Sequence, residues 1–363
     1  MIATVNWTDI MNTDKKNQHY VPKFYLRNFS FENNRKQIGL FNLENECFIP
    51  KAKLKTQASK NFFYGRDGVI EDNLAGIEGR LSRLISGILV NNSLPRCNSQ
   101  EHFDLLEFAV LTDMRTPTRL KQIQQINNEL MKFSSDEIEN GDLVEQLTLM
   151  SSEDILKMNI NNVSRIAGDI KDLSYKLLIN ETPKPFITSD YPVVRYNQFL
   201  EERNHLPSNT GYGFVGLQIF IPLNSRITLI LYDEGIYKIG HRQQKVVPIS
   251  NLKDIEQLNI LQFINCFSTV YFNHEVNEAY IKSLFNKSKS YERANNVLFK
   301  SGKVIDNQPI FSESYMESGD NFIFHNDKDC ELNLDLSVIK VHSKGKRYKM
   351  TESEVQLRKS FKN

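Results

Sequence analysis

The sequence predicts an α+β fold whose central sheet, mixed or mostly antiparallel, is covered by helices from both halves of the chain. Short runs with apolar residues at every second position occupy residues 38–63 and return after residue 174, as is typical of strands. Between these regions, and again from about residue 251, apolar residues recur three or four apart, as is typical of helices. An N-terminal lobe of mixed strands and helices is therefore expected to precede the central sheet.

The N-terminal lobe should begin with strands and continue with helices. Residues 38–63 predict a small β meander, which Gly65 and the Asp67-Gly68 pair close as a turn. From Val69, one apolar stripe marks a helix of about twenty residues. Its members are Ile70, Leu74, Ile77, Leu81, Leu84 and Ile88.

A second helix is expected to follow Ser99, whose hydroxyl can cap a helix N-terminus. Thr116-Pro117 can begin a third helix or kink a continuous one. The polar residues 133–153 indicate a mobile loop or a lightly packed helical segment, and residues 153–170 another helical piece.

The second half of the chain is rich in predicted strands. "SYKLLIN" and "PFITSD" indicate two strands joined across residues 181–183, and "LQIFIPLNSRITLILYDEG" indicates a hairpin turning at Asn224-Ser225. Ile227–Tyr232 is apolar on both faces, as in a central strand.

Helices are expected again after this hairpin. Asn251 begins a helical pattern that we extend through "LKDIEQLNILQFINCFSTVYFN", and a further helix reaches about residue 290. The tail then contains a predicted strand, "CELNLDLSVIKVHS", and the basic run "KGKRYKM".

The composition excludes several classes of protein. With 45 Lys and Arg against 44 Asp and Glu, the formal charge of +1 gives no global field for nucleic acid or an anionic membrane, so polyanion binding would need a local patch. The four cysteines form no CxxC pair, which argues against a zinc knuckle and a disulfide-stapled secreted domain. No apolar run approaches the roughly 18 residues of a membrane span, and the N-terminus lacks the order of a signal peptide. A soluble, cytoplasmic protein is expected.

Familiar catalytic motifs are missing from the sequence. It contains no GxxxxGK[ST], GxGxxG after a strand, HExxH or GxSxG, so most nucleotide-loop enzymes, zincins and α/β-hydrolases are excluded. The stretch "NQHYVPKFYLRNFS" is the first alternative candidate for chemistry. If it is extended, one side carries His19, Val21, Lys23, Tyr25 and Arg27, a face suited to anion recognition. The same pattern also fits half-exposed polar residues on a strand whose aromatic side is core.

Two helices offer charged candidates. Glu71 and Glu78 lie seven apart on one helix face, where they can hold Mg²⁺ or Mn²⁺, act as acid and base, or form a solvated edge. Asp113 continues the buried face of the second helix and therefore needs a partner. Arg115 and Arg119 can pair with it, or can form a clamp for phosphate or carboxylate.

The stretch "FITSDYPVV" delivers polar groups at the end of a strand. Thr188, Ser189 and Asp190 are followed by Tyr191-Pro192, which directs the next residues into an extended conformation. This is a common way to present reactive side chains, and equally a common way to satisfy backbone groups in an Asx turn.

The blocks "QHYVPKFYLRNF", "RTPTR", "FITSDYPVV" and "IPLNSRITLIL" resemble, in that order, the signature blocks of the bacterial family called domain of unknown function 4238. The resemblance covers residues 17–275 and leaves 276–363 as a C-terminal extension. The family often has Asn where Tyr191 stands here, which weakens a role for that side chain. By match, the blocks contain Gln18, His19, Tyr20, Pro22, Arg27, Arg115, Thr116, Pro117, Arg119, Ser189, Asp190 and Pro192.

The family has no assigned activity, so three hypotheses stay open. The first is an RNA phosphodiesterase or other nuclease, acting as a bacterial effector with antiviral defence as its context. In it His19, Asp190 and Arg115 are catalytic, and Asp190 orients the histidine or ligates Mg²⁺ or Mn²⁺ with Glu71 or Glu78. The substrate would be bound by Gln18, Tyr20, Arg27, Arg119 and Ser189.

The second hypothesis is a non-enzymatic sensor that binds a small anionic ligand or a nucleic-acid end. The third is that the blocks only lock the fold, with Asp113 and Asp190 satisfying buried arginines. The first two require His19, the arginines of "RTPTR" and Asp190 to converge in space.

Overall fold

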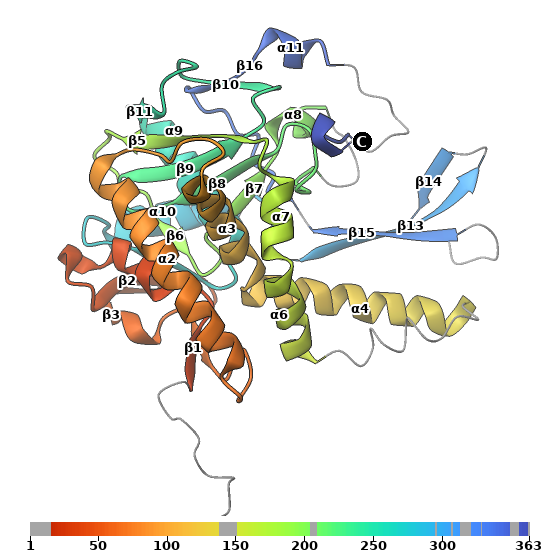
Figure 1. The fold of residues 1–363 in the computed structure, drawn as a ribbon, viewed down its shortest axis with the longest axis horizontal. Helices are drawn as coiled ribbons and strands as arrows, with labels where there is room; N and C mark the ends of the chain where they lie inside the picture. Colours follow the sequence, from red (N-terminus) through yellow and green to blue (C-terminus); the bar gives the residue numbers. More distant parts are fainter. Residues whose placement is uncertain are drawn as a thin grey trace, which may run out of the picture.

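The computed structural model describes residues 16–137, 151–203, 209–294, 296–305, 308–312, 321–327, 329–348 and 356–361. Within these ranges the chain has an α+β architecture in which helices from both halves cover several sheets (Figure 1). The predicted fold class is therefore confirmed. None of the helices described is long and apolar enough to cross a membrane.

A five-stranded sheet forms the centre of the molecule, in the order β11-β5-β9-β8-β7. β11 runs parallel to β5 and the other neighbours pair antiparallel, so the sheet is mixed. The predicted hairpin is confirmed as β8 and β9, and every residue of β9 is buried. The strands are β5 (Ser174–Asn180), β7 (Val194–Tyr196), β8 (Gln218–Pro222), β9 (Ile227–Tyr232) and β11 (Val246–Ile249).

A four-stranded sheet joins the N-terminal strands to later parts of the chain, in the order β3-β2-β12-β6. Its strands are β2 (Gln37–Asn42), β3 (Cys47–Lys53), β6 (Thr188–Ser189) and β12 (Thr269–Phe272). Residues 174–180 and 185–190 were predicted to contain two joined strands. Both strands are present, as β5 and β6, but they belong to different sheets. β5 already pairs with β9 on one side and β11 on the other, so no edge is left there for β6.

The helices largely follow the predicted periodicity. Ser99 caps α3 by accepting from the His102 N–H at 3.1 Å, and Thr116-Pro117 begins α4 and does not kink a longer helix. The helices of the two halves are α2 (Val69–Asn91), α3 (Gln100–Met114), α4 (Pro117–Glu137), α6 (Ser152–Asn161), α7 (Val163–Asp169), α8 (Gln198–Glu201), α9 (Leu252–Asn265) and α10 (Glu278–Ser288). Of the predicted polar segment 133–153, residues 138–150 lie outside the described residues.

The helix predicted from Asn251 ends earlier than expected. α9 stops at Asn265, and residues 269–272 form β12, so the prediction of helix through Asn273 is wrong there. Cys266 has an extended conformation, with φ −58° and ψ 157°. Residues 269–272 are β-branched or aromatic and pair with β2 and β6. This strand pairing replaces the helix, and helical spacing in the sequence does not reveal it.

The opening stretch is extended only at its start. β1 (Asn17–His19) pairs with β4 (Ser59–Asn61), and the chain then turns into α1 (Lys23–Leu26). Pro22 stands at the helix N-cap, and its carbonyl accepts the Leu26 N–H at 3.1 Å. The predicted alternation through Arg27 is therefore wrong beyond Val21, because the chain coils after Pro22. Short 3-10 turns follow at η2 (Arg27–Phe29) and η3 (Phe31–Asn33), with another at η4 (Leu54–Thr56).

Both faces of the central sheet are buried by helices. Leu177, Leu229 and Leu231 belong to a hydrophobic cluster shared with α1, α2 and α3. Leu178 and Ile230, on the opposite face, belong to a second cluster shared with α9 and α10. Alternate residues of one strand thus enter different cores, which explains why β9 is apolar throughout.

The C-terminal region adds to the second cluster and to the edges of the molecule. Leu332, Leu334 and Leu336 are buried there, and β10 (Tyr237–Ile239) pairs with β16 (Ile339–Val341). The strand predicted for residues 330–343 is thus confined to β16. Figure 1 shows β10, β16 and α11 (Ser343–Lys346) at one end, and a sheet in the order β14-β13-β15 beside α4. Its strands are β13 (Val297–Ile305), β14 (Gln308–Ser312) and β15 (Asn321–Asp327), and η5 (Lys359–Phe361) follows near the end of the chain.

Candidate functional site

Gln18 ties the opening block to the turn before α2. Its side-chain amide donates to the Gly65 carbonyl at 3.0 Å, and its oxygen accepts the Tyr64 N–H at 2.6 Å. The side chain is buried, and both ends of its amide are bonded to backbone groups. Gln18 therefore stabilises the joint between β1 and the turn.

His19 is a buried imidazole with one nitrogen in use. Its Nε2 lies 3.1 Å from the Lys55 carbonyl, and since a carbonyl only accepts, Nε2 carries the proton. Nδ1 is buried without a hydrogen-bond partner in the described part of the chain. Burial, helped by the nearby Lys23 charge, lowers the pKa of His19 from 6.5 to about 4, so the ring is neutral at pH 7.

The His19 pKa predicts a loss of stability in acid. Between about pH 6.5 and pH 4 the unfolded chain binds a proton at this residue that the folded chain does not bind. As the pH is lowered through this range, the free energy of unfolding therefore decreases by up to about 3 kcal/mol. We expect His19→Gln to remove this part of the pH dependence, whatever its effect at neutral pH. Urea unfolding of both proteins across this range tests it; parallel pH profiles would contradict the assignment.

Arg115 connects the opening block to the middle block. Its guanidinium is fully buried and donates from Nη2 to the His19 carbonyl at 2.8 Å and to Glu78 Oε1 at 2.7 Å. Its Nε donates to the Tyr20 carbonyl at 3.1 Å. The predicted convergence of His19, Arg115, Arg119 and Asp190 is thus observed only in part: Arg115 bonds to the backbone of His19, whereas Arg119 pairs with Asp113 and Asp190 bonds to residues 267–269.

The two helical glutamates are placed differently. Glu78 pairs with Arg115, whereas Glu71 is half-buried; burial raises the pKa of Glu71 against the opposing effect of Arg115. Among the described residues, no three or more His, Cys, Asp and Glu side chains gather as a metal site would require. A metal role for Glu71 and Glu78 stays a prediction.

Asp190 holds the corner between α9 and β12. Its Oδ1 accepts the Phe267 N–H at 2.7 Å, and its Oδ2 accepts the N–H groups of Ser268 at 2.8 Å and Thr269 at 2.9 Å. Burial raises the pKa of Asp190 to about 6, although these hydrogen bonds oppose the shift. Ser189 donates from its hydroxyl to Gln262 Oε1 at 2.8 Å. Asp190 thus satisfies backbone groups, but those of a distant segment, not those of its own turn as the predicted Asx turn would require.

Asp190 also lies near the opening block. The phenol of Tyr20 has a raised pKa, first because it is buried and then because the Asp190 charge is close to it. The hydrogen bonds of Asp190 nevertheless go to residues 267–269, not to His19. Arg27 is half-buried on η2 and makes no ion pair among the described residues.

A separate polar cluster surrounds Asp113. Arg119 Nη2 donates to its Oδ2 at 2.9 Å, and Arg195 Nε lies 3.7 Å from the same oxygen. The hydroxyls of Tyr191 and Tyr212 each donate to the carboxylate at 2.5 Å. Burial alone would raise the pKa of Asp113, but the two arginines and two tyrosines lower it overall.

The Asp113 cluster changes two expectations. The pairing of Asp113 with Arg119 was predicted, but Arg195 and Tyr212 were missed because they come from distant parts of the chain. Tyr191, which departs from the family's usual residue, contributes its hydroxyl to the cluster. A cavity of about 10 Å³ beside Tyr191 and Arg195 is the size of roughly one water.

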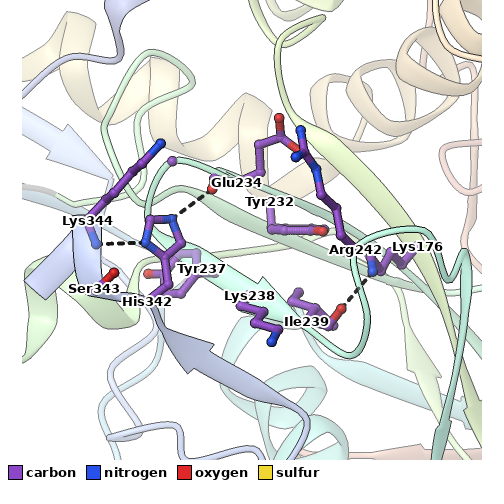
Figure 2. Close-up of a pocket in the computed structure, with 11 residues that line it drawn as sticks. Lys176, Tyr232, Glu234, Tyr237, Lys238, Ile239, Arg242, His342, Ser343 and Lys344 are labelled. Carbon is purple, nitrogen blue, oxygen red and sulfur yellow. Dashed lines mark hydrogen bonds between the residues drawn. The ribbon is translucent and has the colours of Figure 1, made fainter.

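A larger basic pocket, with a volume of about 510 Å³, is lined by residues of β5, β9, β10 and the segment that follows β16 (Figure 2). We define the basic pocket by its charged and titratable lining. These residues are Lys176, Glu234, Lys238, Arg242, His342 and Lys344. The basic tail "KGKRYKM" was the only sequence signal for this site, because the other cations are scattered along strands and loops.

Two of the basic groups are already engaged. Lys176 is 2% exposed and donates from Nζ to the carbonyls of Ile239 at 2.7 Å and His241 at 2.6 Å, and burial lowers its pKa. His342 donates from Nε2 to the Glu234 carbonyl at 3.0 Å and accepts the Lys344 N–H on Nδ1 at 3.0 Å. Both His342 nitrogens therefore form hydrogen bonds, and the ring links the Glu234 carbonyl to the backbone of Lys344.

The remaining cations are available to a ligand. Lys238, Arg242 and Lys344 are exposed, and no ion pair or side-chain hydrogen bond is formed by them within the described ranges. Glu234 is the one acid on the pocket wall, and its carboxylate accepts the Ser174 hydroxyl at 2.5 Å. The pocket therefore has an excess of positive charge, which favours an anion.

Comparison with known proteins places the chain in a family without giving it an activity. Residues 17–275 match a family described as Protein of unknown function (DUF4238). No curated protein and no solved structure matches the chain. The match spans more than half of the sequence and has the boundaries expected from the signature blocks. This protein therefore belongs to the DUF4238 family.

Proposed function

We propose that the protein is a binding module for a small anionic ligand, which the basic pocket takes up. The observation that carries the proposal is the convergence on one cavity of Lys238, Arg242 and Lys344, three exposed cations that form no ion pair within the described part of the chain. A volume of about 510 Å³ is within the range of small-molecule sites. The formal charge of the whole chain is only +1, so anion binding depends on a local excess of positive charge such as this one.

Recognition fits the pocket better than catalysis. A catalytic site needs a base or nucleophile free to react, but both nitrogens of His342 are engaged, and Lys176 is held by two carbonyls. The cations that remain are Lys238, Arg242 and Lys344, which are exposed beside a partly apolar lining that includes Ile239. Such groups bind charge without positioning a reaction.

Calorimetric titration with inorganic phosphate, pyrophosphate and ATP tests the proposal. We expect saturable binding that weakens with added salt, because the cations are exposed. The double variant Lys238→Gln, Arg242→Gln should weaken binding by about tenfold or more, the effect of losing roughly 1.4 kcal/mol. Lys60→Gln, at an exposed lysine of β4, is the matched control and should bind as the wild type does. Absence of binding to all three anions would refute the proposal.

A cytoplasmic location is part of this proposal. All four cysteines are free, with Cys47 and Cys97 exposed and Cys266 and Cys330 buried. Exposed thiols persist in a reducing compartment, where small phosphorylated molecules are also abundant.

An RNA phosphodiesterase is the second candidate, favoured by one feature of His19. Its unprotonated Nδ1 is buried without a partner among the described residues, so it can accept a proton, with Arg115 and Lys23 close by. RNA can be cleaved through its own 2′-hydroxyl without a metal. A pKa of about 4 makes this imidazole a weak base, which is why we rank this function second.

Incubation with labelled RNA and DNA, with and without Mg²⁺ or Mn²⁺, tests the nuclease. Cleavage of RNA that His19→Ala abolishes and Lys60→Ala preserves would support it. A metal requirement would point to Glu71 and Glu78. Because Asp190 also bonds to residues 267–269, a folding assay must show whether Asp190→Ala lowers activity directly or by destabilising the protein. No cleavage under any of these conditions would exclude this candidate.

A further inference from the structure

We infer that the ligand is a polyvalent phosphate compound that bridges the family core and the C-terminal segment 339–347, so that binding holds this segment closed on the core. The inference rests on the proposed function, since it concerns the same basic pocket. It adds the ligand class and a consequence for the C-terminal segment.

The basic pocket has two walls from distant parts of the chain. Lys176, Lys238 and Arg242 come from the core, whereas His342 and Lys344 follow β16 in the extension. Figure 2 shows His342 and Lys344 on one side of the cavity and Arg242 and Lys176 on the other. A ligand between them would touch both walls.

The direct connection between the walls is short. β10 and β16 are three residues each and pair only with one another in their sheet, which makes the ladder marginal on its own. His342 adds two contacts, from its N–H to the Ile236 carbonyl at 3.0 Å and from its ring to the Glu234 carbonyl. Ile239 and Ile339 are buried in the joint, Val341 packs against the same cluster, and the Gly240 N–H donates to the Val338 carbonyl at 3.3 Å.

The centre of this ladder carries an unfavourable charge pair. Lys238 lies directly opposite Lys340, and both side chains are exposed without an ion-pair partner in the described ranges. Like charges at directly opposite positions destabilise an antiparallel pair. The repulsion is present because the segment is docked, and it disappears when the segment leaves.

An anion at this position would relieve the repulsion and attract both walls. One with two or more charges can contact Lys238 and Arg242 on the core and Lys344 on the segment together, and its charge also offsets that of Lys340, which stands opposite Lys238. A pyrophosphate carries more charge than a single phosphate with which to attract both walls, and a nucleoside polyphosphate would also fill more of the 510 Å³ cavity. Since such a ligand binds the closed form more tightly, it must also shift the segment toward closure.

Amide hydrogen exchange of the full chain tests the bridge. With pyrophosphate or ATP, the amides of residues 339–347 should exchange about tenfold or more slowly than in sodium chloride of equal ionic strength. Inorganic phosphate should protect them less. Lys340→Gln should slow exchange without ligand, because the repulsion is gone, and should reduce the further protection that pyrophosphate brings. Lys60→Gln is the control and should resemble the wild type.

The outcomes separate the inference from the proposed function. If calorimetry shows pyrophosphate binding but exchange at residues 339–347 is unchanged, the bridge is refuted and the binding module stands. Equal protection of the wild type and Lys340→Gln, with or without ligand, also refutes the bridge. If no anion binds, both fail.

Discussion

Replacing Arg115 with glutamine is expected to lower the free energy of unfolding by about 3–5 kcal/mol. The guanidinium is fully buried and donates to the carbonyls of His19 and Tyr20 and to the Glu78 carboxylate. The substitution leaves these three acceptors without their donor, and Glu78 is only 27% exposed. Lysine should recover only part of the loss, because its single ammonium cannot span the positions that the planar guanidinium reaches.

Urea unfolding followed by circular dichroism measures the Arg115 effect. Arg83→Gln is the matched control, since Arg83 is exposed on α2 without an ion pair in the described ranges and should change stability by less than about 0.5 kcal/mol. If Arg115→Gln unfolds at the wild-type urea concentration, the joint between the opening and middle blocks is not what stabilises this part of the fold.

Asp113→Asn is expected to have a similar effect, about 3–5 kcal/mol. The neutral amide cannot balance the positive charges of Arg119 and Arg195. Its NH₂ group is a donor, and it would face a tyrosine hydroxyl or a guanidinium that also donates, so that neither has an acceptor. The loss comes from buried cations left with less negative charge, not from a change in size.

The pH dependence identifies the Asp113 charge as the cause. Its pKa is lowered in the folded chain, so its contribution is fully present above the unfolded value of about 3.9 and is lost as pH falls through the folded value. The difference between wild type and Asp113→Asn should therefore be largest at neutral pH and shrink in strong acid. Asp335→Asn, at a 79% exposed carboxylate, is the control and should have little effect. A difference that does not vary with pH would contradict this explanation.

The third hypothesis, that the signature blocks lock the fold, accounts for most of their observed contacts. Asp113 satisfies Arg119 as that hypothesis expected, but Asp190 bonds to residues 267–269 and not to an arginine. Gln18, Arg115 and Asp190 each bond chiefly to backbone groups of other segments. The blocks are far apart in sequence, yet each fastens one segment to another. Their catalytic and substrate-binding roles stay predictions, which the nuclease assay addresses.

Local features were predictable because neighbouring residues decide them. The apolar stripe of α2, the caps at Ser99 and Asn251 and the turn at Asn224-Ser225 all depend on residues within a few positions of each other. The family blocks and the α+β class follow from the same kind of pattern.

Tertiary structure decided the features for which distant segments compete. β6 and β12 pair with each other because the edges of β5 are occupied, and Asp113 takes Tyr191, Arg195 and Tyr212 from parts of the chain about 80–100 residues away. The basic pocket arises only where the C-terminal segment meets β10. Sequence spacing by itself determined which segments coil and which extend, except after Pro22 and at residues 269–272. It could not determine their partners, because pairing and burial depend on which surfaces remain free after the chain has folded.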